Sequence, residues 1–340
     1  MTKKISEQVV VVTGASSGIG RLTARMFAER GASVVIGARN VEALGDLAVE
    51  IKEAGGRAIA VPTDVSERHQ VDHLAQAAVD HFGRIDTWVN NAGVSLYATF
   101  DKLTDAEIRR VMDVNFMGTV YGMQAALPLM RAAGGGTIIN VASIAGKRAI
   151  PLQSVYSASK YAIVGLGEAL RTELAAQGSE IDVCTICPPS INTPFFDHAR
   201  TKEGRAPKPL PPVYEPEAVA EAILSCAESP QREVLIGVAG KAFAILNTLA
   251  PGLSDWYLGK TGVEGQLLDE PKSADAPDNL FRAPTEIRER SHWTVTGGKG
   301  GVPASLSPDL IKRHPVAACA AAFVAAALAG RFLFGPGVET

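Results

Sequence analysis

Short β-rich runs alternate with longer stretches of helical periodicity over most of the chain, and this alternation restricts the fold more than any other feature. The expected strands are 8–14, 33–38, 57–62, 85–90, 136–143, 181–187 and 232–237. Between them, stretches such as 67–82 and 105–130 carry apolar residues at helical spacing. Such alternation builds β-α-β units with a parallel sheet covered on both faces. We therefore predict a doubly wound α/β domain over residues 1–240.

Charge and the first residues restrict the partners and the location. The formal net charge is −3, without the basic excess that nucleic acid selects, so no nucleic-acid partner is expected. The opening residues run from two lysines directly into an apolar stretch and a glycine turn, without the pattern of a secretory signal. We expect a cytoplasmic protein.

Beyond residue 240 the alternation stops. Composition shifts toward Gly, Pro and polar residues, and we expect an irregular extension or linker over 241–310. Residues 311–340 are expected to hold an apolar, alanine-rich helix. Every residue of 316–330 is apolar, but the run is shorter than the roughly 20 residues that span a bilayer. Two hypotheses stay open: membrane association beside Lys312 and Arg313, or packing against this protein or a second subunit.

Two short patterns resemble metal sites. Cys184 and Cys187 form C-x-x-C, but they lie in an expected buried strand, where residues three apart point to opposite faces. His69 and His73 are four apart on an expected helix and have no third ligand in view. No metal site is predicted.

A glycine-rich turn, "TGASSGIG", joins the first expected strand to the first helix. Gly14, Gly18 and Gly20 permit a tight turn and a close approach of the backbone. A pyrophosphate can then bind the free N–H groups at the helix N-terminus. The turn predicts a dinucleotide site.

Tyr156 and Lys160 lie four residues apart in "YSASK", on one face of an expected helix. A free tyrosine has a pKa near 10. A neighbouring ammonium favours the phenolate, so we expect a lowered pKa for Tyr156. Such a phenol can serve as a general acid or base toward a carbonyl or an alcohol.

With "TGASSGIG", "NNAG" and "YSASK" in this order, residues 5–240 resemble the short-chain dehydrogenase/reductase (SDR) family. The resemblance implies a Rossmann fold of about seven strands that carries both cofactor and active site. It also implies an oxidoreductase that interconverts a carbonyl and an alcohol by hydride transfer. In the family, Ser143 would hydrogen-bond the substrate oxygen, and Asn115 would anchor a water that leads protons to Lys160.

The end of the second strand indicates the cofactor. An acidic residue there would bind a ribose hydroxyl and select NAD, but this chain has Ala38 followed by Arg39. Arginine can pair with a 2'-phosphate, which favours NADP(H); the alternative is that Arg39 points into solvent. The resemblance implies further cofactor contacts at Gly14, Ser16, Ser17, Gly18, Ile19, Gly20, Asp64, Val65, Asn90, Asn91, Ala92, Gly93, Tyr156, Lys160, Pro188, Ile191 and Thr193.

One departure from the family pattern leaves the substrate open. Pro189 stands where the family usually has glycine, and proline fixes φ and removes an N–H. Phe195 and Phe196 follow in the expected substrate loop and either line an apolar pocket or pack on the core. We expect a small-molecule substrate and a homo-oligomer. The alternative functions are a non-redox, epimerase-like enzyme and a cofactor-sensing binding module.

Overall fold

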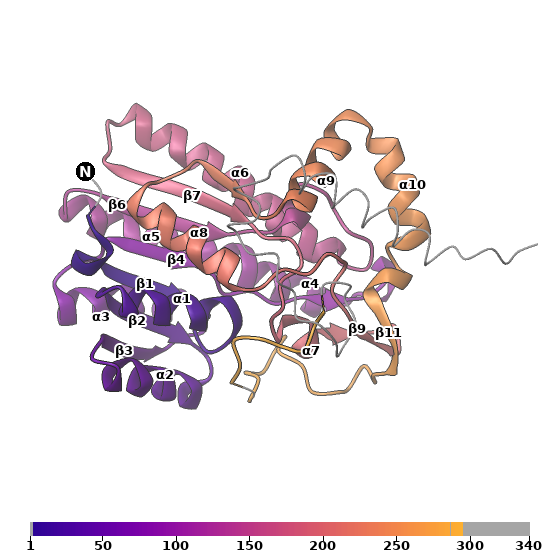
Figure 1. The fold of residues 1–340 in the computed structure, drawn as a ribbon, viewed down its shortest axis with the longest axis horizontal. Coiled ribbons are helices and arrows are strands. Elements are labelled where there is room, and N and C mark those ends of the chain that lie inside the picture. Colours follow the sequence, from indigo (N-terminus) through magenta and orange to yellow (C-terminus); the bar gives the residue numbers. More distant parts are fainter. Residues whose placement is uncertain (1–2, 286, 295–340) are drawn as a thin grey trace, which may run out of the picture.

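The computed structural model describes residues 3–285 and 287–294. Within this part, seven parallel strands form one sheet in the order β10-β7-β6-β4-β1-β2-β3 (Figure 1). The strands are β1 Val9–Thr13, β2 Ser33–Ala38, β3 Arg57–Pro62, β4 Thr87–Asn90, β6 Gly136–Val141, β7 Ile181–Cys187 and β10 Glu233–Leu235. The predicted doubly wound parallel sheet is confirmed, with ends that differ from the expected ones by at most two residues.

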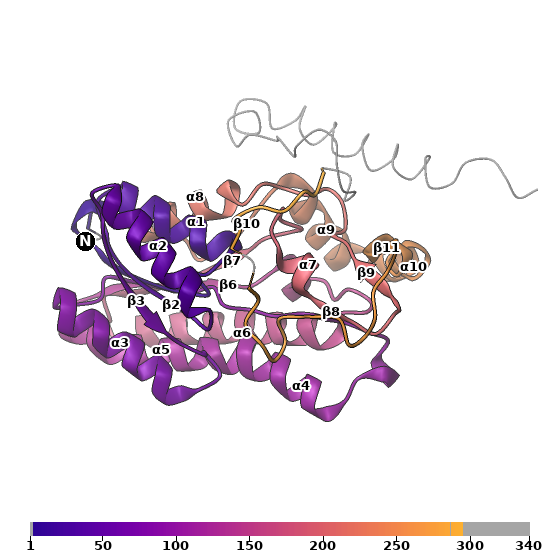
Figure 2. The ribbon, with the colours of Figure 1, turned by 90° about the horizontal axis from the view of Figure 1, so that it is seen from below.

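Helices cover both faces of this sheet (Figure 2). One face packs against α1 Gly18–Glu29, α2 Val41–Glu53 and α8 Glu217–Glu228, and the other against α3 Arg68–Phe82, α5 Gly118–Ala132 and α6 Ser154–Ala176. Two shorter helices are α4 Asp105–Met112 and α7 Phe195–His198. Because both faces are covered, the central strand β1 is buried along its whole length and its sequence is continuously apolar as far as Val12.

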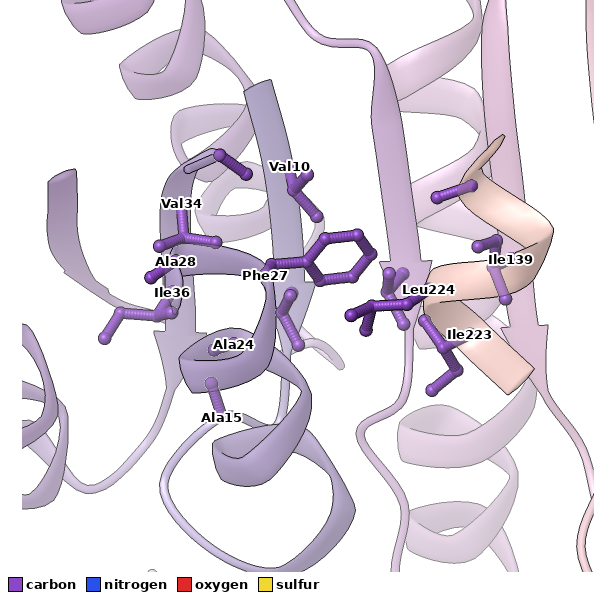
Figure 3. Close-up of a cluster of buried hydrophobic side chains, with 14 of the residues drawn as sticks. Val10, Ala15, Ala24, Phe27, Ala28, Val34, Ile36, Ile139, Ile223 and Leu224 are labelled. Atoms are coloured by element: carbon purple, nitrogen blue, oxygen red, sulfur yellow. The ribbon is translucent and has the colours of Figure 1, made fainter. Parts of the chain in front are cut away.

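Phe27 lies at the centre of the core on one face of the sheet. It comes from α1 and packs among Val10 of β1 and Leu224 of α8 (Figure 3). All three side chains are fully buried. Their packing fixes α1 over β1, and so fixes the glycine turn that joins the two.

The expectation of irregular structure from residue 241 onward is wrong for its first part. Residues Val238–Leu249 form α9 and Pro251–Thr261 form α10. The strand β11, Leu267–Pro271, pairs with β9, Arg205–Pro207, and β5, Leu96–Tyr97, pairs with β8, Arg200–Thr201. Pro251 opens α10, where its missing N–H has no helical partner to lose.

Residues 278–285 and 287–293, here called the strap, return along the Rossmann domain and pass α7 (Figure 1). Leu280 is fully buried in the core cluster shared with α3 and α5. Arg110 Nε donates to the carbonyl oxygen of Leu280 at 2.9 Å, and Arg25 forms a bidentate ion pair with Glu289. The strap is therefore part of the folded unit. The limits of the three predicted domains stay a prediction, and residues 311–340 lie outside the described residues.

We expect Leu280→Ala to lower the free energy of unfolding by about 2–5 kcal/mol, because it leaves a cavity in the core. Its neighbour Phe281 is a matched control. That ring is half exposed and only meets the Arg200 guanidinium at 5.2 Å, so Phe281→Ala should cost less than about 1 kcal/mol. Urea unfolding of both variants is the measurement. Equal losses would contradict a strap that belongs to the core.

Candidate active site

A cavity of about 230 Å³ opens at the carboxyl ends of the parallel strands. Its wall begins directly after β1, β2, β4, β6 and β7, at Gly14, Arg39, Asn91, Ala142 and Pro188. The strand order reverses between β1 and β4. A crevice at such a switch point is where open α/β sheets bind their ligands.

The glycine turn forms one wall of the cavity. Gly14 has a φ of +68°, and a Cβ added there would lie 2.7 Å from Ala92 Cα. A Cβ on Gly20 would lie 2.3 Å from Gly14 O. Ser16, Ser17, Gly18 and Ile19 line the cavity, whereas Gly20 does not. The N-terminus of α1 therefore faces the cavity, which suits a pyrophosphate.

The strap reaches this same helix end. Gly18 N donates to the carbonyl oxygen of Arg288 at 2.8 Å. A pyrophosphate bound at the N-terminus of α1 would meet an N–H that already has an acceptor. Cofactor binding and this strap contact therefore compete for one donor.

Arg39 lies at the cavity and does not point into solvent. Its Nη2 donates to the carbonyl oxygen of Asn279 at 2.6 Å. Its Nη1 is buried and makes no hydrogen bond within residues 3–285 and 287–294. Burial lowers the pKa of Arg39, while the nearby Asp64 acts in the opposite direction. The buried Nη1 is a donor that lacks an acceptor among the described residues.

Asp64 also lies at this end of the cavity, and its carboxylate is already bound. Arg110 Nη2 donates to it at 2.7 Å and Ser66 Oγ at 2.8 Å. Burial acts to raise the pKa of Asp64, but these hydrogen bonds outweigh burial and lower it. Asp64 is thus ionised and paired with Arg110. It does not accept a hydrogen bond from Arg39 Nη1, which keeps that donor available to a ligand.

The Tyr156–Lys160 pair lies deep in the cavity. Lys160 Nζ donates to Val141 O at 2.9 Å and lies 5.6 Å from the centroid of the Tyr156 ring. Burial lowers the pKa of Lys160 from 10.5 to about 8. Burial also raises the pKa of Tyr156 to about 12, against a hydrogen bond with Ser143 that acts to lower it.

The expected lowering of the Tyr156 pKa is therefore wrong for this structure. Burial is the largest influence on the pKa of either residue, and it disfavours the charged form of both. The Tyr156 ring is enclosed by protein on all sides except toward the cavity, where part of it stays exposed. With its pKa raised to about 12, the phenol is protonated at neutral pH.

Ser143 stands two residues after the end of β6, beside Tyr156. Its Oγ accepts from Ala145 N at 3.1 Å and donates to Pro188 O at 3.4 Å. These contacts hold the hydroxyl at the cavity wall. Ser143, Tyr156 and Lys160 all line the cavity.

Asn115 lies behind this group, in a single π-helical turn at Asp113–Met117, a feature common at functional sites. Its Oδ1 accepts from Val94 N at 2.9 Å, and its Nδ2 donates to Val94 O and Ser159 Oγ, both at 3.0 Å. A Cβ added to Gly93 would lie 3.5 Å from Asn115 Oδ1 and 3.7 Å from Lys160 Nζ. Asn115 and Lys160 thus face each other across Gly93.

The structure brings most predicted site residues to one cavity. Those lining it are Gly14, Ser16, Ser17, Gly18, Ile19, Arg39, Asp64, Val65, Asn91, Ala92, Gly93, Ser143, Tyr156, Lys160, Pro188, Ile191 and Thr193. Gly20, Asn90 and Asn115 do not line the cavity and lie behind its wall. The Asn90 side chain is buried against Trp88 Nε1 and Asn140.

The cavity residues that the sequence did not indicate include Asn279 and Pro284 of the strap, His198 of α7, and Gln153. The strap sequence reads as a polar linker, so no local signal marks it. Gln153 precedes α6; it accepts from Ser95 Oγ at 3.0 Å and donates to Gln266 Oε1 at 2.6 Å. The segment after α10 therefore supports the entry to the helix that carries Tyr156.

The two cysteines of the C-x-x-C pattern lie on opposite sides of the sheet. Cys184 packs in the core with α8, and Cys187 in a separate cluster with Ile163. In the part of the chain that the structure describes, no group of three potential metal ligands occurs.

A glycine turn at the switch point of a Rossmann sheet, with Ser143, Tyr156 and Lys160 in the same cavity, defines a nicotinamide-dependent oxidoreductase. The chain belongs to the short-chain dehydrogenase family, whose model matches residues 8–204. An SDR from Burkholderia phymatum, solved in complex with NAD, has the same fold, with a TM-score of 0.66. At 28% identity, the match covers 74% of this chain and 96% of that one.

Two relatives extend the comparison. The uncharacterized oxidoreductase YxnA of Bacillus subtilis is 42% identical over 85% of this chain and 82% of its own length. The Ketoacyl reductase HetN of a Nostoc species is 35% identical over 68% of this chain and 79% of its own length. The match to YxnA extends over 290 residues, more than the 240 of the predicted Rossmann domain, so the similarity includes part of the extension.

The buried ammonium of Lys160 should appear in the pH dependence of stability. Its pKa is lower in the folded chain, so the native state releases this proton near pH 8 and the unfolded state only near 10.5. Stability therefore rises with pH across this window, by up to about 3 kcal/mol, relative to a Lys160→Met variant. Urea unfolding of both proteins from pH 6 to 10.5 tests this. Below pH 7 the difference should be constant, and parallel curves throughout would contradict a buried charge.

Proposed function

We propose that this protein is an NADP(H)-dependent oxidoreductase that interconverts a carbonyl and an alcohol. The observation that carries the proposal is one cavity with a proton donor at one end and a guanidinium at the other. Tyr156 stands beside Ser143 and Lys160, and Arg39 reaches the same cavity from β2. A cytoplasmic location and a homo-oligomeric assembly stay predictions.

The residues of this chain fit the proton chemistry of carbonyl reduction. The bound nicotinamide supplies the hydride. Ser143 holds the carbonyl oxygen, and the protonated phenol of Tyr156 donates its proton as negative charge develops there. Lys160, charged at neutral pH with a pKa of about 8, stabilises the phenolate that remains. Its hydrogen bond to Val141 O keeps the ammonium in place.

The cofactor preference rests on the end of β2. Ala38 is buried and carries no carboxylate to bind a ribose hydroxyl. Arg39 follows with its unpaired, buried Nη1. A 2'-phosphate would supply the missing acceptor and a compensating charge, which supports NADP(H) over NAD. The SDR from Burkholderia phymatum was solved with NAD, so the preference needs its own test.

The substrate end of the cavity is largely apolar. Phe195 and Phe196 line it with Ile150, and the Phe195 ring lies 5.8 Å from that of Tyr156. Both phenylalanines thus line the cavity and also pack against neighbouring rings. We propose an apolar carbonyl compound as substrate, in line with the name of the relative HetN, a ketoacyl reductase.

We expect Tyr156→Phe to bind NADPH normally and to lose turnover by roughly 100- to 10,000-fold, because the ring stays and the proton donor is lost. Tyr161→Phe is the matched control. That tyrosine lies on the same helix, is exposed, and should leave turnover unchanged. NADPH oxidation against a panel of aldehydes, ketones and acyl-thioester ketones is the assay. Wild-type turnover by Tyr156→Phe would refute the mechanism.

We expect the unmodified protein to bind NADPH more tightly than NADH, and Ala38→Asp with Arg39→Ile to reverse this order. Loss of a charge-assisted pair should weaken NADPH binding about ten- to a hundredfold. Titration of both cofactors by calorimetry is the measurement. NADH affinity is the internal control, since it should not fall. Equal affinity of the unmodified protein for the two cofactors would contradict the proposed preference for NADP(H).

A further inference from the structure

The pair of helices α9 and α10 carries an exposed apolar surface. Half of the exposed large apolar side chains of the described residues lie between positions 245 and 257. They are Ile245, Leu249, Leu253, Trp256 and Tyr257, here called the hairpin face, with exposed fractions from 46% to 78%. The others, such as Phe100 and Val41, are scattered singly. A contiguous patch of this kind marks an interaction surface.

The helix pair α9–α10, here called the hairpin, is held to the rest of the chain by polar contacts. Arg148 donates to Asn247 Oδ1 at 3.0 Å and to Asp255 at 2.5 Å, and Asn247 Nδ2 donates to Lys147 O at 3.1 Å. Ser254 and Leu258 are buried beneath α10. The hairpin face therefore lies on an element that is docked on the rest of the chain, and its apolar side chains are exposed.

The charges on the hairpin are arranged around the apolar face. The two helices contain three charged residues: Lys241, Asp255 and Lys260. Asp255 is paired with Arg148, and both lysines are exposed. An apolar face with tryptophan and tyrosine, flanked by lysines, is the composition of an interfacial membrane-binding helix.

A second part of the chain points to the same partner. The sequence of residues 316–330 is apolar throughout and follows Lys312 and Arg313. Alone it is shorter than the roughly 20 residues that cross a bilayer. Within the described residues no helix is long and apolar enough to cross one either. Two basic-flanked apolar segments on one chain suit attachment to a bilayer surface.

We propose that the hairpin face rests on a lipid bilayer that contains anionic headgroups, with its aromatic and aliphatic side chains in the interface and Lys241 and Lys260 against the headgroups. Gly240, at the base of α9, lies beside Ile144 and Pro189, which line the cavity. Docking thus places the bilayer next to the cavity wall. This placement, which rests on the proposed function, suits carbonyl substrates that dissolve in lipid.

Trp256 gives a direct probe. Of the three tryptophans, Trp88 and Trp293 are 0% and 1% exposed, whereas Trp256 is 63% exposed. Vesicles of phosphatidylcholine and phosphatidylglycerol added to the full chain should shift its emission to the blue, and brominated lipids should quench it. In sedimentation with the same vesicles, Leu249→Ser, Leu253→Ser and Trp256→Ser combined should weaken binding by at least about tenfold. Phe100→Ser, equally exposed elsewhere, should not.

Three results would overturn the proposal, and none depends on catalysis. If acrylamide quenched none of the tryptophan emission in the absence of vesicles, Trp256 would be covered in the free protein, and residues 316–330 or a second copy would occupy the hairpin face. Vesicle binding by the triple variant at the wild-type level would assign attachment elsewhere. Equal weakening by Phe100→Ser would show a non-specific effect. Circular dichroism of each variant verifies that it is folded.

Discussion

The close contact between the β1–α1 turn and the segment after β4 is the constraint on which the rest of the site depends. Thr13 Oγ1 accepts from the backbone N–H groups of Asn91 and Ala92, at 3.0 and 3.2 Å, and Asn91 Nδ2 donates to Thr13 O at 2.9 Å. Gly14 then approaches Ala92 so closely that no side chain fits between them. This contact joins the two halves of the sheet at the point where the strand order reverses, and the cavity opens directly above it.

Burial decides the proton state of Tyr156 and Lys160, the proposed catalytic pair. Tyr156 and Lys160 face each other in surroundings that disfavour charge on both, which leaves a protonated phenol beside an ammonium whose pKa is only about 8. The cost of keeping Lys160 buried is a local loss of stability, a pattern expected at functional sites. The same burial makes the site ready to donate a proton to a carbonyl oxygen.

The extension contacts the site directly and forms part of it. Gln266 donates to Pro151 O at 2.8 Å and accepts from Gln153, so the segment after α10 supports the entry to α6. The strap places carbonyl oxygens against the two groups expected to bind cofactor phosphates, the Gly18 N–H and the Arg39 guanidinium. The same extension presents an apolar face to the outside. The extension from residue 238 onward therefore supports the cavity, contacts the groups expected to bind the cofactor phosphates, and forms part of the outer surface.

The sequence by itself determined the sheet and the motif residues that line the cavity. Continuous apolar runs such as Val9–Val12 specify strands buried on both faces, and the ordered motifs around Gly14, Ser143 and Tyr156 place the chemistry at strand ends; these are local signals. Only the tertiary structure decided that the strap contacts Gly18 and Arg39, and that burial raises the Tyr156 pKa. Those outcomes depend on residues that are distant in the chain and on how completely they exclude water, which no short stretch of sequence encodes.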